Sequence, residues 1–130
     1  MQNAALQAVG LSGWRYQRMP VPPELFVSTV RALEAAGFRG ANVTIPHKQV
    51  ALELADESSQ AAREIGAANT LLFEDGRIRA ENTDAPALIG ALPVEARGKT
   101  ILVLGDSLSD GFRLSRSEAY PALLGGKLRA

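Results

Sequence analysis

Two separate groups of residues in this 130-residue chain have types and spacings that could do chemistry. The first group spreads over three short motifs, Gly40–Lys48, Ile65–Thr70 and Glu81–Ala85, which hold a lysine, an aspartate and several asparagines and threonines. Lysine and aspartate can transfer protons, and amides and hydroxyls can hydrogen-bond a small polar molecule. In the second group, Ile101–Gly111, an apolar run leads to Ser107, a residue type that can act as a nucleophile.

Alternating helices and strands are predicted to position these motifs. Periodicity and punctuation by glycine and proline predict helices over Met1–Val9, Pro22–Gly37, from Pro46, Asp56–Gly66, Asp84–Pro93 and Ser117–Leu128. Strands are predicted over Trp14–Val21, Arg39–Ile45, Ala67–Phe73, Arg77–Ala80 and Thr100–Leu104, with Asp75 and Gly76 as a hairpin turn. This order predicts an α/β fold of three layers, in which a mainly parallel sheet has helices on both faces.

Composition narrows the class of protein. The formal net charge is zero, so the chain has no overall positive potential that would attract nucleic acid, and no nucleic-acid partner is expected. There is no cysteine and His47 is the only histidine, which argues against a zinc finger or any multi-histidine metal site. No apolar run reaches the ~18 residues of a membrane span, so we expect no membrane contact and a cytoplasmic protein.

The three motifs of the first group resemble those of shikimate dehydrogenases, and the resemblance covers residues 1–104, the substrate-binding (N-terminal) domain. It implies an oxidoreductase of the shikimate pathway, in aromatic amino acid biosynthesis, that reduces 3-dehydroshikimate to shikimate with NADPH. By match to the family motifs, Lys48 and Asp84 are the catalytic proton-transfer pair. Thr44 and Asn69 match residues that hydrogen-bond the substrate, and Asn42 lies beside them as a support for the loop.

Each of these residues also has an ordinary structural interpretation. Lys48 taken alone could be a solvated surface charge, and Asp84 a helix N-cap. Asn69 could be a satisfied amide at the end of a strand, and Thr44 a β-branched strand residue. The joint pattern of three ordered motifs favours the functional interpretation, whereas His47 is interpreted as local packing or loop support.

The chain departs from the family pattern in two places. Relatives carry a strand and a serine-containing loop before the segment matched by Met1–Leu6, and those serines bind the substrate carboxylate. We therefore expect only weak binding of shikimate or 3-dehydroshikimate. After Ile101–Leu104 relatives have a glycine-rich NADP turn, but here Gly105 precedes Asp106, whose carboxylate would repel phosphate. This chain alone is thus expected to bind no cofactor and to be inactive.

The second group resembles the first block of GDSL (SGNH) esterases of the arylesterase and lysophospholipase type, over residues 99–128. The resemblance divides the chain into a shikimate dehydrogenase-like part, 1–98, and a strand, loop and helix tail, 99–130, as in a chimera. Ser107 matches the nucleophile, but the base and the later oxyanion donors of that family are absent. Ser107 is therefore better explained as a turn residue.

Three functions remain open: a dehydrogenase substrate domain that is inactive alone, a GDSL-type serine esterase or lipase fragment, and a non-catalytic α/β module. We also expect Ile101–Leu104 to take an interior position in the sheet, next to the strand around Val43, in place of the family's first strand. The alternative is that this segment extends away from the sheet. A second copy of the chain could then pair with the exposed sheet edge and form a homodimer.

Overall fold

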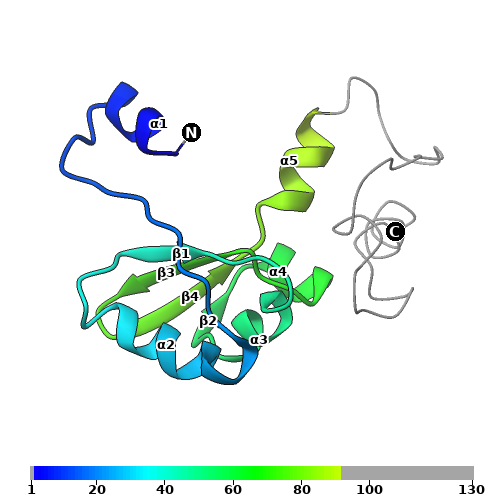
Figure 1. Ribbon diagram of the computed structural model, residues 1–130. Coiled ribbons are helices and arrows are strands. Elements are labelled where there is room, and N and C mark those ends of the chain that lie inside the picture. Colours follow the sequence, from blue (N-terminus) through cyan, green and yellow to red (C-terminus); the bar gives the residue numbers. More distant parts are fainter. Residues whose placement is uncertain (1, 92–130) are drawn as a thin grey trace.

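The computed structural model describes residues 2–91 of the chain. These residues form a four-stranded sheet, five helices and one short 3-10 turn. The elements in order are α1 (Gln2–Ala8), η1 (Pro23–Leu25), α2 (Phe26–Leu33), β1 (Gly40–Asn42), α3 (Lys48–Glu53), β2 (Glu57–Ser58), α4 (Gln60–Ile65), β3 (Thr70–Glu74), β4 (Arg77–Glu81) and α5 (Asp84–Ala91). Helices α2 and α3 lie against the sheet (Figure 1).

The strand order in the sheet is β1-β3-β4-β2. Strand β3 runs antiparallel to both β1 and β4, and only the short pairing of β2 with β4 is parallel. The expectation of a mainly parallel sheet is therefore wrong for the described residues. A two-residue connection forces β3 and β4 to be antiparallel, and β1 also returns antiparallel to β3 although two helices separate them.

The β3–β4 hairpin confirms the predicted turn. Asp75 and Gly76 both have positive φ, 52° and 76°, which is the backbone that a tight two-residue hairpin needs. Glycine adopts this conformation without steric cost, and aspartate is one of the few other residues that tolerate it. The turn sets the register that places Leu71 opposite Ala80 and Phe73 opposite Ile78.

One face of the sheet carries the core. Alternate side chains of β3 and β4 point to that face, and helices α2 and α3 cover it (Figure 1). The core residues are Phe26, Val30, Leu33, Val43, Ala51, Ala68, Leu71, Phe73 and Ala80. The opposite face carries charged side chains of β4, and α1 and α5 stand away from the sheet (Figure 1). A complete second helical layer, as expected for three layers, is not seen in residues 2–91.

Helix α2 confirms the interpretation of its sequence. Phe26, Val30 and Leu33 recur at helical spacing and all three are buried. Pro23 opens the preceding 3-10 turn, where its missing N–H costs nothing. Beyond the helix, Gly37 has a φ of 87°, the left-handed conformation that ends helices.

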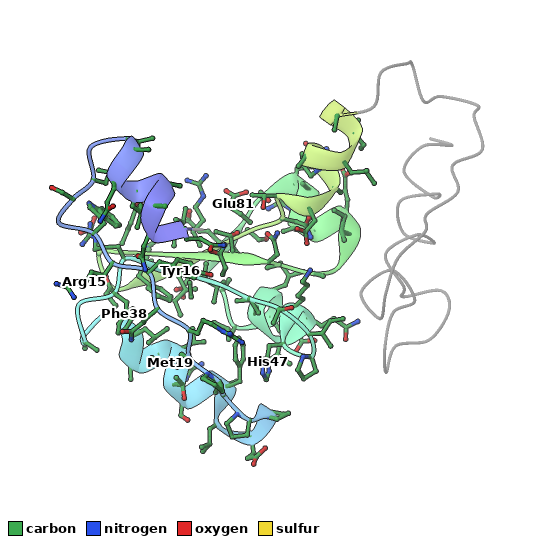
Figure 2. All side chains as sticks on the ribbon, turned by 45° about the horizontal axis from the view of Figure 1, so that its top comes forward. Arg15, Tyr16, Met19, Phe38, His47 and Glu81 are labelled. Carbon is green, nitrogen blue, oxygen red and sulfur yellow. The ribbon has the colours of Figure 1, made fainter. Side chains whose placement is uncertain are left out.

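Segment 14–21 was predicted as a strand and is not one. It runs as an extended chain without ladder partners in the described sheet, and Arg15, Tyr16 and Met19 lie along it (Figure 2). The side chain of Asn3 replaces a neighbouring strand at one point, since it donates to the Tyr16 carbonyl and accepts the Tyr16 N–H. Alternation of residue types describes two faces of a strand but supplies no partner strand.

Several predicted boundaries are also corrected. The strand predicted over Arg39–Ile45 is only the three residues of β1, at the edge of the sheet. Asp56 does not cap α4; Ser59 does, by accepting the Ala62 N–H, while the Asp56 carboxylate accepts the Ile78 N–H. The predicted end at Gly66 is confirmed, with a φ of 75°.

Gly40 is the one described glycine at which an added Cβ would meet other atoms within 4 Å. A Cβ built there would lie 2.6 Å from the main-chain oxygen of Leu71 on β3. We expect Gly40→Ala to lower the free energy of unfolding by about 1–3 kcal/mol, because β1 must move away from its partner strand. Urea unfolding measures the loss. Gly13→Ala, where the added Cβ meets nothing within 4 Å, is the control, and an equal midpoint for both variants would contradict the prediction.

The strand predicted over Thr100–Leu104, the helix over Ser117–Leu128 and the placement of Ile101–Leu104 beside Val43 lie outside the described residues. The same holds for Ser107, and each of these stays a prediction.

Candidate functional site

An ion pair joins the starts of two helices. Lys48 is the first residue of α3 and Asp84 the first residue of α5, and Lys48 Nζ donates to Asp84 Oδ2 at 2.8 Å. The two residues are 36 positions apart in the chain. Their side chains are 26% and 42% exposed, so the pair is open to solvent and to a ligand. A lysine ammonium oriented by a carboxylate in this way is placed to transfer a proton to or from a ligand.

The turn before α3 is anchored by His47. Its ring stacks on Phe26, with centroids 4.4 Å apart and planes 2° from parallel, and its Nε2 is 2.9 Å from the Val21 carbonyl oxygen. The same turn contains the cis peptide bond between Ile45 and Pro46. These contacts tie the start of α3 to α2 and to the extended segment, in line with the sequence interpretation of His47 as packing and loop support.

Asn69 holds the loop that leads to Asp84. It is 8% exposed, and its side-chain oxygen accepts the Thr83 N–H at 3.0 Å while its Nδ2 donates to Thr83 Oγ1 at 3.0 Å. Its backbone joins both neighbouring segments, because its N–H donates to the Glu81 carbonyl and its carbonyl accepts the Val43 N–H. Much of the hydrogen-bonding capacity of Asn69 is therefore used inside the protein.

Asn42 and Thr44 lie on the β1 side of Asn69. The exposed Asn42 donates to Thr70 Oγ1 at 3.2 Å, and that hydroxyl donates to Asn69 Oδ1 at 3.1 Å. Thr44 is exposed just beyond β1, and its carbonyl accepts the His47 N–H. The described contacts thus form two groups, Lys48 with Asp84, and Asn42 with Asn69 through Thr70. Asn69 also bonds Thr83, the chain neighbour of Asp84, and Thr44 joins the site only through its backbone contact with His47.

Sequence reasoning missed Asn82. This residue is 5% exposed, and its side chain bonds to the backbone at Ala67 and Ala85. A signal for it was present, since an asparagine directly before Thr83 and Asp84 is well placed to bond the first N–H groups of a helix. The burial of its amide could only come from the tertiary structure.

Glu81, at the end of β4, is a carboxylate held by neighbours. Hydrogen bonds from Arg79 and Ser59 keep the pKa of the Glu81 carboxyl below its ordinary value. Arg79 Nη2 lies 2.7 Å from Glu81 Oε1, and this contact raises the pKa of the guanidinium. The stabilisation from the lowered carboxyl pKa is present above the unfolded pKa and fades as pH falls through the folded value.

Other kinds of site are not seen in the described part of the chain. Within residues 2–91 no three histidine, cysteine or acidic side chains gather closely enough to hold a metal ion. No helix in the same range is long and apolar enough to cross a membrane.

The fold and the ion pair define an α/β domain with a polar site at the starts of two helices. A family model described as the shikimate dehydrogenase substrate binding domain matches residues 1–71, more than half of the chain. The chain belongs to this family.

Individual relatives agree with the family model. The shikimate dehydrogenase (NADP(+)) of Methylobacterium radiotolerans is 52% identical over 98 residues, which are 69% of this chain and 35% of the relative. That of Methanothermobacter thermautotrophicus is 44% identical over 107 residues, 81% of this chain and 38% of the relative. The chain thus spans little more than a third of the length of these relatives.

Solved structures give the same family. Shikimate dehydrogenase from Aquifex aeolicus matches with a TM-score of 0.76 and 32% identity, over 97% of this chain and 46% of that one. The Thermus thermophilus enzyme, solved in complex with NADP(H) and shikimate, matches with a TM-score of 0.62 and 39% identity, over 67% of this chain and 33% of that one. These matches give the esterase resemblance of residues 99–128 no support.

Proposed function

We propose that this chain supplies the substrate-binding part of an NADP-dependent shikimate dehydrogenase, with Lys48 and Asp84 as its proton-transfer pair. The observation that carries the proposal is the 2.8 Å contact between Lys48 Nζ and Asp84 Oδ2, in a chain of this family. It is supported by the relatives named shikimate dehydrogenase (NADP(+)).

The pair has the chemistry that a carbonyl reduction needs. When 3-dehydroshikimate is reduced, the carbonyl carbon gains a hydride and the carbonyl oxygen gains a proton. The Lys48 ammonium would give that proton to the oxygen, and in the reverse direction the lysine amine would take it from the hydroxyl. The Asp84 carboxylate would orient the lysine through their hydrogen bond.

Polar groups around the pair are suited to hold the ring hydroxyls of such a substrate. Thr44 presents an exposed hydroxyl, and Asn69 has a second Nδ2 hydrogen besides the one bonded to Thr83. Asn42 supports this arrangement through Thr70, which bonds Asn69. Thr44 and Asn69 are therefore the proposed substrate-binding residues, and Asn42 their support.

The hydride donor would be NADPH. Residues 2–91 contain no G-x-G-x-x-G pattern, the glycine-rich turn that lets a backbone approach a diphosphate. The described residues therefore do not fit this cofactor, and the proposal assigns to them binding and proton transfer only. That the chain alone binds no NADP remains our proposal.

Titration with shikimate, followed by NMR, tests the proposed function. We expect weak binding, with Kd of about 1 mM, because the described groups are few and partly exposed. The amide signals of Thr44, Lys48, Asn69 and Asp84 should shift together, and the purified chain should show no NADP-dependent oxidation of shikimate. Shifts confined to other surfaces would contradict the site, and measurable turnover would contradict the proposal that the chain alone binds no NADP.

Three finer expectations from the sequence remain predictions. They are the cytoplasmic location, the esterase-like origin of the tail with Ser107, and a homodimer through an exposed sheet edge. The last has one structural feature in its favour, since β1 is an edge strand of the described sheet.

A further inference from the structure

We infer that Asn82 is a positioning residue, whose buried amide sets the relative placement of Lys48 and Asp84. Its importance for catalysis rests on the proposed function, but its structural effect on the pair can be measured without a ligand. Figure 2 labels His47, in the turn before α3, and Glu81, at the end of β4, which directly precede Lys48 and Asn82 in the chain.

The Asn82 side chain uses both ends of its amide. Nδ2 donates to the Ala67 carbonyl at 3.0 Å, and Oδ1 accepts the Ala85 N–H at 3.3 Å. The residue is only 5% exposed, so water competes little for either group. A buried amide with both ends bonded restrains the two backbone segments that it joins.

Those two segments carry the ion pair. Ala68, next to Ala67, donates its N–H to the Lys48 carbonyl at 2.8 Å. At the other end, Ala85 is the direct neighbour of Asp84 in the first turn of α5. A continuous path of hydrogen bonds and peptide units therefore runs from the backbone of Lys48, through Asn82, to the backbone of Asp84.

This path matters because the ion pair is weak as a restraint by itself. Partly exposed ion pairs contribute little to holding two segments together, since water screens them and the lysine side chain has many rotamers. The Asp84 side chain is 42% exposed. The distance between the helix starts must then be set by buried contacts. Two of these contacts are the hydrogen bonds of the Asn82 side chain.

The chemistry of the two bonds explains why this residue is an asparagine. An aspartate of the same shape would still accept the Ala85 N–H but could not donate to the Ala67 carbonyl, and it would place two acceptors face to face. The change therefore removes one restraint of the path and leaves the other. Asn82→Asp is the sharpest variant, with Asn82→Ala as a second that introduces no charge.

Asn3 offers a matched control. Its side chain also makes two hydrogen bonds to the backbone: it donates to the Tyr16 carbonyl at 2.9 Å and accepts the Tyr16 N–H at 2.7 Å. It belongs to α1, which has no buried residue. Asn3→Asp thus removes a side-chain donor to the backbone at an exposed position, without touching the path between Lys48 and Asp84.

The ligand-free experiment follows the Lys48 side-chain ammonium by ¹⁵N NMR. Asp84→Asn defines the resonance position of a lysine without its carboxylate. We expect Asn82→Asp and Asn82→Ala to move the resonance towards that position, and Asn3→Asp to leave it unchanged. A resonance unchanged by both Asn82 substitutions would overturn the inference. If neither variant folds, the through-bond coupling from Asn82 Nδ2 to the Ala67 carbonyl is measured in the unmodified chain, and its absence would equally overturn it.

The second experiment measures shikimate affinity in a double-mutant cycle. We expect Asn82→Asp to weaken binding about tenfold, which corresponds to about 1.4 kcal/mol, and to add less than about twofold once Asp84→Asn is present. Additive losses would mean that Asn82 does not act through the pair. If the unmodified chain binds no shikimate, the proposed function fails, and the ammonium resonance still decides the role of Asn82.

Discussion

Replacing Lys48 by methionine is expected to weaken shikimate binding by about 10- to 100-fold, since hydrogen bonds to charged groups contribute about 1.5–3 kcal/mol. Methionine keeps most of the side-chain length and removes the ammonium that contacts Asp84 Oδ2. The affinity is measured by NMR titration with shikimate, and thermal unfolding shows whether each variant stays folded.

A matched control removes a different ion pair. Arg77 Nη1 lies 2.9 Å from Glu57 Oε1, with both side chains well exposed, on the charged face of the sheet. Arg77→Met should change the shikimate affinity by less than about twofold, because exposed pairs away from a ligand contribute little. A shikimate affinity that Lys48→Met leaves unchanged would exclude the proposed site.

The second large effect concerns the core. Phe73 is 1% exposed on the apolar face of β3, and we expect Phe73→Ala to lower the free energy of unfolding by about 3–5 kcal/mol. This is a large part of the ~5–15 kcal/mol that stabilises a typical domain. The loss combines the forfeited transfer free energy of the removed ring with the cost of the cavity that it leaves in the core.

Urea unfolding measures this loss from the shift of the midpoint at constant slope. Leu72→Ala on the same strand is the control, because Leu72 points to the opposite face and is only half-buried. A loss at Leu72 as large as at Phe73 would show that both faces of β3 are equally packed, contrary to the described core.

Local features of the fold were predictable because their causes are local. The Asp75–Gly76 turn requires positive φ at two adjacent residues, and these residue types favour it wherever they occur between strands. The buried stripe of α2 follows from the spacing of Phe26, Val30 and Leu33. A helix that ends at a glycine, as α4 does at Gly66, depends on that single residue.

Features that depend on a partner segment were predicted poorly. Segment 14–21 alternates like a strand, but a strand exists only when another backbone pairs with it, and within residues 2–91 none does. The same reason explains the direction of the sheet, since β1 and β3 could be joined in either sense by the helices between them. The predicted N-cap of α4 was Asp56, but its carboxylate accepts the Ile78 N–H of β4, and Ser59 caps the helix.

The residue types of the site could be identified from the sequence by itself. A lysine, an aspartate and polar neighbours in three ordered motifs were enough to expect a proton-transfer pair and its family. Only the tertiary structure decided how Lys48 and Asp84 meet, through the buried amide of Asn82 and the bonds of Asn69 to Thr83. The physical reason is that residue types carry the chemistry, whereas the distance between groups 36 positions apart depends on every segment packed between them.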